Sequence, residues 1–496
     1  MHGSSATRPP PPQSETPPAT NLNVPGVGMD LSDWIRLESH RWQLPASGGM
    51  RVPVIACASE ALLLEMNPMV RQQACRVAQL PGIAASVLLM PDAHWGHGFP
   101  IGAVAAFDGE RGGVVCAAGV GFDMACGVRA LLTGLRREQV LSQQQALADA
   151  LQARILAGLG STDALQLNDD TQEAMLRGGA HWAVEQGWGY PEDLQRCELR
   201  GCSGDADPGA LSVLARQRQR NELRTRGSGK HYLEVQVVQE LLAPELAAAL
   251  DLELDAVVVM MQEGSSGLGH QVANDFMQLM REAEPRQGGA VLEHELVHAP
   301  IGSPLGQHYL GALRAVINGG LASRQILSQL VREAFAQFWP EAQLQVLYDH
   351  CHNTCHQEDH LVGHDCRRLI VQRKGATCAF GPGHGALAEP FSHTGQPVLV
   401  GGAMGSASYV LVGVDGNEAL SLSSACLGSG RRQWSGRQLR ETLNAHGIAV
   451  RCTSSRSLAE TAPGADRDLE AVVAAAEAAG LARRVARLQP LICIKN

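Results

Sequence analysis

The pattern of apolar and polar positions changes twice along the chain. Residues 1–28 are polar and Pro-rich, as in ATRPPPPQSETPPAT, and hold too few apolar side chains to form a core. From Met50 onward, apolar residues come in short, regularly spaced runs that predict packed strands and helices. We therefore expect a disordered tail over 1–28, an N-terminal extension over 29–49 and one folded domain over 50–496.

Two periodicities occur within the folded part. Short apolar runs bounded by Gly, Pro or polar residues predict strands, namely RVPVIAC, SVLLM, GFPIGAVAAF, GGVVCAAGVGF, KHYLEVQVV and AVVVMM. Apolar residues spaced three and four apart predict helices over 142–159, 323–338 and 468–488. Strands and helices alternate without a regular strand-helix-strand repeat, which favours an α+β fold, a single irregular mixed domain with a β-sheet core flanked by helices.

Composition limits the compartment and the mode of nucleic-acid binding. No apolar run reaches the roughly 18 residues that a membrane helix needs, and the N-terminus has no secretion-signal layout, so we expect a cytoplasmic protein without membrane contact. The 13 scattered Cys indicate reduced thiols in a chain of this length. The formal net charge of −10 argues against a broad nucleic-acid-coating surface, because such binding depends on many Lys and Arg, but it leaves room for a local basic groove.

The segment GVGFDMACGVR carries the sharpest chemical signal. Asp123 and Cys126 lie three residues apart between glycines, which allow the backbone to turn tightly around a small object. A carboxylate oxygen and a thiolate that converge there form a plausible corner of a metal site. The alternative is a buried Cys in a Gly-rich turn.

Candidate side chains also occur in three other segments, PDAHWGHGFPIG, GSGKHYLEVQ and DHCHNTCHQED. The first has the form of a second Gly-rich turn, and the second opens a predicted strand. The candidates are Asp92, His94, His97, His231, Glu234, His352, Asn353 and Glu358.

Two further patterns have the spacing of metal sites. HELVH at His294–His298 matches the zinc-protease pattern, but the surrounding VLEHELVHAP alternates like a strand and reaches Pro300, so we interpret the match as coincidence. His352, His356 and His360 could share one helix face as a separate metal site, although two cysteines at the same spacing favour an ordinary amphipathic turn.

Taken in order, these motifs resemble the RtcB family of GTP-dependent RNA ligases. The likeness runs from about Met50 to the last residue through LLMPDAHWGHGFPIGAVAAF, GVGFDMACGVR, GSGKHYLEVQ, GSSGLGHQV, RKGAT, GAMGSASYVLVG, LGSGR and the terminal IKN. It implies the joining of RNA ends that carry a 3′-phosphate or 2′,3′-cyclic phosphate to 5′-hydroxyl ends. It also implies GTP, one or two Mn(II) ions, a covalent guanylyl-histidine and an archease-like activator protein.

The resemblance also assigns roles to individual residues. The metal ligands that it implies, with Cys126 bridging two ions, are Asp123, Cys126, His231, Gln262 and His352. The residues that it implies hold the nucleotide are Lys230, Glu234, Asn353, Ser408, Arg431 and Lys495. The catalytic positions are Asp92 and Leu427.

The chain departs from the family on the nucleotide-transfer side. LGSGR stands where the family has HGAGR, so Leu427 occupies the position of the guanylylated histidine and has no nucleophilic atom. QEGSSG stands where the family has HSGSRG, so Gln262 replaces a metal-binding histidine and Ser266 an arginine. The other departures are Lys230 for asparagine, Glu263 and Ala403 for serine, and Gln372 for histidine. Replacement nucleophiles could be His270, His384 or His393, each of which we first interpret as an ordinary surface or core histidine.

Three functions therefore remain open from the sequence. The first is an RNA ligase with a modified mechanism. The second is a metal-dependent phosphoesterase that opens cyclic phosphates, for which the intact Asp123, Cys126 and His231 set suffices. The third is a non-catalytic protein that binds RNA ends or nucleotides.

Overall fold

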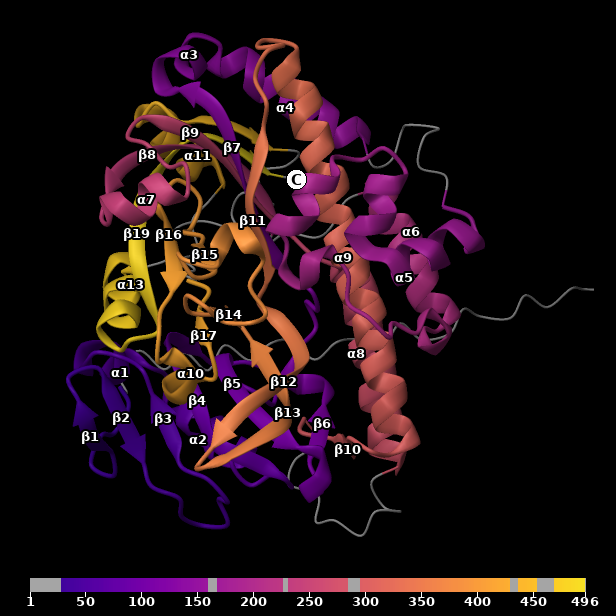
Figure 1. Ribbon diagram of the computed structural model, residues 1–496, viewed down its shortest axis with the longest axis vertical. Helices are drawn as coiled ribbons and strands as arrows, with labels where there is room; N and C mark the ends of the chain where they lie inside the picture. The colour runs from indigo at the N-terminus through magenta and orange to yellow at the C-terminus, as the bar shows by residue number, and fades with distance from the viewer. Residues whose placement is uncertain are drawn as a thin grey trace, which may run out of the picture.

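Two large β-sheets occupy opposite ends of the molecule, and one long helix runs beside both of them (Figure 1). This arrangement is seen in a computed structural model that describes residues 28–158, 167–225, 231–283, 295–428, 436–452 and 468–495. Helices and sheets are mixed along the chain, which confirms the predicted α+β class. None of the helices in the described ranges is both long enough and apolar enough to cross a membrane.

The first sheet contains the early strands and one later hairpin. Its strands, in pairing order, are β1 (Ile35–Glu38), β2 (Arg41–Leu44), β3 (Val54–Ala56), β4 (Ile83–His94), β5 (Ile101–Asp108), β13 (Asp365–Lys374) and β12 (Asn353–Val362). Only β3 and β4 pair in parallel. The segment predicted as an N-terminal extension thus contributes β1 and β2 to this sheet.

The second sheet positions most of the candidate site. Its strands, in pairing order, are β11 (Gln345–Cys351), β7 (Gly127–Arg136), β9 (Ala256–Glu263), β8 (Tyr232–Leu241), β19 (Ala482–Lys495), β16 (Ser408–Gly413) and β15 (Pro397–Val400), and β18 (Ala449–Cys452) pairs in parallel with β19. Two small sheets pair β6 (Val114–Cys116) with β10 (His298–Pro300) and β14 (Ala376–Cys378) with β17 (Ser424–Cys426).

Both faces of the second sheet are buried, as the continuous apolar run in β9 indicates. Alternate side chains of a strand point to opposite faces. Val259 and Met261 accordingly pack in one cluster with α4 (Gln144–Gly158) and α9 (Pro304–Ala336), while Met260 packs in the opposite cluster with α7 (Pro244–Ala249).

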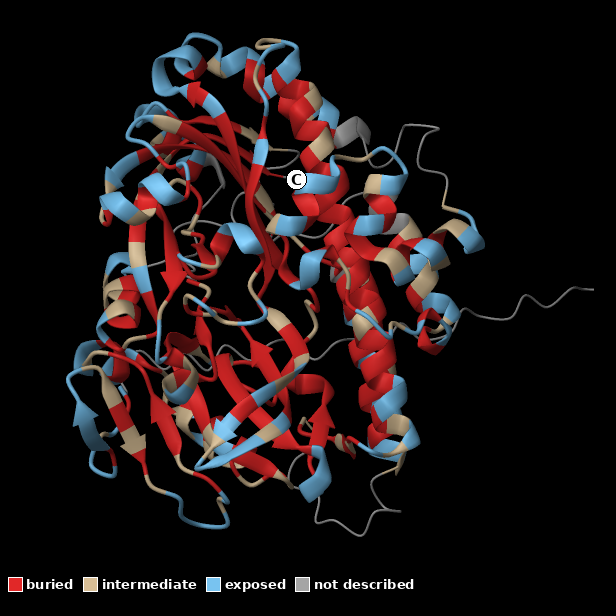
Figure 2. Cartoon of the chain, in the orientation of Figure 1, coloured by how far each residue is buried: buried red, intermediate tan, exposed pale blue. Residues whose placement is uncertain are grey.

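The long helix α9 organises the helical side of the molecule. It begins at the N-cap Ser303, whose hydroxyl accepts from the Gly306 N–H, and Pro304 sits at its first turn. The helix packs against α4, α5 (Asp169–Glu185) and α8 (Ser266–Ala283), and most of its length is buried (Figure 2). The other α-helices of the described residues are α1 (Glu60–Glu65), α2 (Pro68–Val77), α3 (Arg137–Ser142), α6 (Val213–Thr225), α10 (Asn417–Ser421), α11 (Gly436–Ala445) and α13 (Leu469–Ala478).

One predicted helix is wrong in its second half. The helix expected over 468–488 ends as α13 at Ala478, and Gly480 with φ +75° turns the chain into β19. The Arg-rich segment after this turn pairs with β8 and β16. The apolar spacing of a helix continues after Gly480, but strand pairing determines the structure of that segment.

A buried ionic cluster joins α9 to the second sheet. Asp349 on β11 accepts from Arg129 Nε on β7 at 2.9 Å and from Arg324 Nε on α9 at 2.7 Å. All three side chains are fully buried. Removing one charge from such a cluster leaves the others without compensation, which typically costs about 3–5 kcal/mol.

We predict that Asp349→Asn lowers the free energy of unfolding by about 3–5 kcal/mol, because two guanidinium groups would stay buried beside a neutral amide. Chemical denaturation followed by circular dichroism measures this loss. Asp359→Asn is the matched control, since Asp359 forms its ion pair with Arg368 at the exposed surface. Equal denaturation midpoints for the two variants would contradict the structural role of the cluster.

Candidate functional site

The loop before β7 brings Asp123 and Cys126 to the same side of a tight turn. The turn is closed by the Cys126 N–H, which donates to the Asp123 carbonyl at 3.3 Å. Ala125 has a φ of +59°, a conformation that costs energy outside glycine. Gly127 must lack a side chain, because a Cβ there would lie 2.7 Å from the Arg324 guanidinium carbon.

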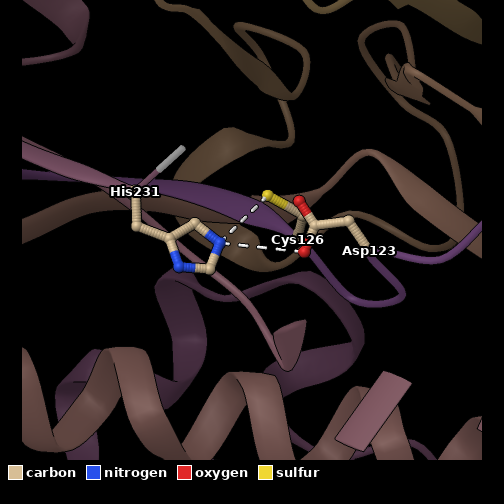
Figure 3. A group of neighbouring side chains, drawn as sticks. All are labelled: Asp123, Cys126 and His231. Atoms are coloured by element: carbon tan, nitrogen blue, oxygen red, sulfur yellow. Dashed lines mark hydrogen bonds and ion pairs between the residues drawn. The ribbon is translucent and has the colours of Figure 1, made fainter. Parts of the chain in front are cut away.

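His231 completes a group of three donor atoms (Figure 3). It lies immediately before β8, and its Nε2 is 3.7 Å from Asp123 Oδ1 and 3.9 Å from Cys126 Sγ. The three donor atoms all lie within 4.8 Å of one another. His231 and Cys126 are buried, while Asp123 is half-buried. The structure thus brings together the three residues that the sequence predicted as one metal half-site.

Two residues that the resemblance assigns to the nucleotide contact the backbone of this group. The Asn353 Nδ2 donates to the Asp123 carbonyl at 2.8 Å, and its Oδ1 accepts from the Gly375 N–H at 2.8 Å. The Lys495 Nζ donates to the His231 carbonyl at 2.7 Å. Asn353 therefore anchors the metal-site loop with both ends of its amide.

Two carboxylates, those of Asp123 and Glu263, lie beside the His231 ring. Its Nδ1 lies 3.2 Å from Glu263 Oε1, a contact that sequence reasoning missed because Glu263 was considered only as a replaced serine. Burial alone would lower the pKa of His231, but Glu263, Asp123 and Cys126 together raise it well above its ordinary value. The group is thus suited to hold a cation, which displaces the imidazole proton when it binds.

Gln262 and His352 both contact Cys126, the first at its thiol and the second at its backbone. The Gln262 Nε2 donates to Cys126 Sγ at 3.3 Å, and the His352 N–H donates to the Cys126 carbonyl at 2.9 Å. The His352 ring is buried, and its Nδ1 has no hydrogen-bond partner among the described residues. Burial, followed by repulsion from His350, lowers the pKa of His352 to about 3, so its ring is neutral as a metal ligand requires.

A second polar cluster joins β8 to β16. The Gln236 Nε2 donates to Glu234 Oε2 at 2.6 Å and to Ser408 Oγ at 2.9 Å, while the Cys493 thiol contacts Glu234 Oε1 at 3.3 Å. Burial raises the pKa of Glu234 to about 7, even though Gln236, Cys493 and Lys495 lower it. Sequence reasoning missed Gln236, although its position two residues after Glu234 on a strand places both side chains on one face.

The two predicted catalytic positions are linked through the backbone. Asp92 is buried, and its Oδ2 accepts from the Gly428 N–H at 2.8 Å, next to Leu427. The Leu427 side chain is half-buried and packs against an apolar cluster of the second sheet. Lys230 and Arg431 lie outside the described residues, as does the side chain of Ser266.

The reserve histidines have other surroundings. His384 stacks on Phe380 with ring centroids 4.2 Å apart, His270 packs beside Phe122 at 5.0 Å, and His393 is exposed. Each of these contacts fits the ordinary reading of a surface or partly packed side chain.

The HELVH segment does not form a helix in its described part. His294 lies outside the described residues, and His298 begins the strand β10. The helix face suggested for His352, His356 and His360 is wrong, because residues 353–362 form strand β12. Asn353 is the first residue of this strand, and its side chain accepts from the N–H of Gly375, which follows β13.

Comparison with known proteins agrees with this geometry. A family model described as "tRNA-splicing ligase RtcB" matches residues 73–496. The chain is 40% identical over 470 residues to a protein of Thermococcus kodakarensis named "tRNA-splicing ligase RtcB", covering 92% of this chain and 97% of that protein. It is 44% identical over 434 residues to the "RNA-splicing ligase RtcB" of Mycobacterium tuberculosis, covering 86% and 100% respectively.

A mixed α+β fold with a carboxylate, a thiol and an imidazole around one point defines a candidate metal-dependent enzyme class. Within that class of metal-dependent enzymes, 40% identity over 92% of the chain identifies one family. The chain belongs to the RtcB family of RNA ligases.

The high pKa of Glu234 gives a pH-dependent prediction. The folded chain binds a proton at Glu234 between the ordinary pKa of about 4.5 and the raised value of about 7, so this residue makes stability fall as pH rises through that window. Glu234→Gln removes the effect. As pH rises from 4.5 to 8, the free energy of unfolding of the variant should increase relative to that of the native chain by on the order of 2–3 kcal/mol.

Urea denaturation of both chains across this pH range provides the measurement. The difference between the two unfolding free energies cancels the other titrating groups. A difference that stays constant with pH would show that Glu234 ionises normally in the folded chain.

Proposed function

We propose that this chain binds Mn(II) at Asp123, Cys126 and His231 and acts on RNA ends that carry a 3′-phosphate or a 2′,3′-cyclic phosphate. The observation that carries the proposal is the convergence of these three donor atoms within 4.8 Å of one another. The names of the similar proteins support RNA as the substrate class.

The donor set fits a divalent ion of intermediate softness. It offers one hard carboxylate oxygen, one imidazole nitrogen and one soft thiolate sulfur, a mixture that Mn(II) and Zn(II) accept. When bound, such an ion polarises phosphoryl oxygens and neutralises the charge that develops on them. Glu263 orients the His231 ring from its Nδ1, and Asn353 fixes the backbone of Asp123.

A second, weaker cation position is proposed at Gln262 and His352, with Cys126 shared between the two ions. His352 supplies a neutral buried ring, and its backbone N–H donates to the Cys126 carbonyl. Gln262 supplies an amide whose oxygen turns toward an ion only after the amide rotates away from its contact with Cys126. A neutral amide is also a weaker ligand than imidazole, so this position should bind its ion less tightly.

A GTP site is proposed from Glu234, Ser408 and Lys495, together with Lys230, Asn353 and Arg431. Gln236 holds Glu234 and Ser408 in one connected cluster, and a carboxyl group there can read the edge of a base through hydrogen bonds. Asn353 contributes by fixing the loop rather than by a free amide. An archease-like activator stays a prediction.

The transfer of a guanylyl group to residue 427 is the part of ligation that this chain lacks. Leu427 has no atom that can attack a phosphorus, and its side chain packs against apolar neighbours. The intact Asp123, Cys126 and His231 donor set, together with a residue 427 that has no nucleophilic atom, favours opening of a cyclic phosphate as the retained chemistry. The other two alternatives are an RNA ligase with a modified mechanism and a chain that binds RNA ends or nucleotide without catalysis.

We predict that the purified chain binds at least one Mn(II) and that Asp123→Asn and Cys126→Ser each abolish tight binding, because each removes a charged ligand. Metal analysis and titration followed by Mn(II) electron paramagnetic resonance measure the stoichiometry. Cys366→Ser is the control, since Cys366 is exposed and remote from the group in sequence. Full Mn(II) binding by the Asp123→Asn and Cys126→Ser variants would contradict the assignment of these residues as Mn(II) ligands.

We predict that Leu427→His alone does not create a working ligase. The change restores the attacking atom. Attack also requires a correctly positioned α-phosphate, and such positioning lowers the activation barrier by roughly 7–11 kcal/mol. The loss of one preorganised donor typically costs about 100- to 1000-fold in rate. Gln262, Ser266 and Lys230 all replace groups that the family resemblance implies in the transfer step.

Incubation with α-labelled GTP and Mn(II), followed by detection of labelled protein and of joined RNA, distinguishes the three functions. The combined variant Leu427→His, Gln262→His, Ser266→Arg and Lys230→Asn should take label where Leu427→His does not. Label on the native chain would show a replacement nucleophile. If the Leu427→His variant ligated RNA at the rate of the combined variant, the changes at Gln262, Ser266 and Lys230 would have no effect on ligation.

A further inference from the structure

A second group of metal-ligating side chains lies apart from the Asp123 group. Glu198 begins the short helix η5 (Glu198–Gly201), His356 lies on β12, and Cys378 ends β14. The carboxylate oxygen, imidazole nitrogen and sulfur of these residues all lie within 4.8 Å of one another. Three segments that are distant along the chain therefore converge on one point.

The orientation of Glu198 directs one oxygen into this group. Its Oε2 accepts from the Cys351 N–H, which fixes the carboxylate plane. Its Oε1 lies 2.9 Å from His356 Nε2 and 3.8 Å from Cys378 Sγ. The carboxylate and the thiol are buried, while the His356 side chain is 10% exposed.

The spacing of the donors fits a tetrahedral ion. Zn(II) takes sulfur at about 2.3 Å and nitrogen or oxygen at about 2.0–2.2 Å, which separates neighbouring tetrahedral ligands by roughly 3.3–3.7 Å. The distances of 2.9 Å and 3.8 Å in the metal-free chain differ from this range by a few tenths of an ångström. The imidazole nitrogen of His356 and the sulfur of Cys378 lie within 4.8 Å of each other, so the three donors face one common point.

The charges also fit a divalent ion. Arg373 lies nearby, but its guanidinium is already paired with Glu358 in a two-point contact. Glu198 and a Cys378 thiolate together supply two negative charges, which a Zn(II) ion neutralises in a buried position. Burial keeps the metal-free Cys378 thiol protonated by raising its pKa, so binding transfers one proton from the sulfur to solvent.

We propose that Glu198, His356 and Cys378 form a Zn(II) site with a fourth position open to solvent or to a small ligand. The site is separate from the Asp123 group and does not rest on the proposed function. It joins η5, β12 and β14 and so holds the chain on both sides of His352, through the Glu198 contact with Cys351 and through His356.

The test begins with a chain whose first group is disabled by Asp123→Asn and Cys126→Ser, so that only the second group can bind metal. Zn(II) titration against a chromophoric chelator should give one tight ion per chain. Co(II) substituted for Zn(II) should give a near-ultraviolet thiolate-to-metal absorption, because Cys378 is then the ligand sulfur.

Adding Cys378→Ser should remove both the tight Zn(II) and the thiolate absorption, whereas Cys355→Ser should leave both unchanged. Cys355 is the matched control, since it is a buried thiol next to His356 on β12. His356→Gln serves as a second test that keeps the sulfur. Circular dichroism checks the folding of every variant.

Absence of tight Zn(II) in the chain with the disabled first group would overturn the proposal and leave Glu198 and His356 as an ordinary ion pair. So would a thiolate absorption that survives Cys378→Ser. Loss of Zn(II) with His356→Gln, in a chain that folds, would support the site even if Cys378→Ser failed to fold.

Discussion

The buried guanidinium of Arg324 is the contact on which the candidate site depends. Its Nε pairs with Asp349 on β11, and its Nη1 donates to the carbonyls of Ala125 and Glu263, both at 3.0 Å. One residue of α9 thereby fixes the loop before β7, the end of β9 and the neighbouring strand β11. The positive φ of Ala125 persists because this guanidinium holds its carbonyl in place.

The backbone around the Asp123, Cys126 and His231 group is held by several side chains, whereas residue 427 has lost the histidine that the family resemblance implies. Arg324 and Asn353 fix the backbone of the Asp123 loop, and Lys495 fixes that of His231. The Leu427 side chain packs against apolar neighbours and offers no nucleophile, although Asp92 still holds the adjacent Gly428 amide. Asp92 therefore contacts the backbone beside a residue 427 whose side chain has no nucleophilic atom.

Sequence reasoning predicted the features that depend on local pattern or on family motifs. The α+β class, the strands β3, β4, β5, β6, β8 and β9, and the Asp123, Cys126 and His231 group follow from periodicity and from recognised segments. The contacts of Arg324, Gln236 and Glu263 could not be predicted, because each joins elements far apart in the sequence.

The wrong predictions have a common physical cause. The segment after Gly480 and the segment around His356 both have helical spacing, yet each is a strand. In the described residues β12 pairs with β13, and β19 pairs with β8 and β16, and this pairing outweighs a weak local preference for helix. Recognition of the Glu198, His356 and Cys378 group likewise required the fold, since its members come from three separate elements.

The central claim is that the turn held by Arg324 presents a ready cation site. Crystals grown with Mn(II), with diffraction data collected on both sides of the Mn absorption edge, test it most directly. The account predicts an anomalous peak bounded by Asp123 Oδ1, Cys126 Sγ and His231 Nε2, with the turn unchanged. A map without a peak at that point, or with Mn(II) bound only elsewhere, would contradict it.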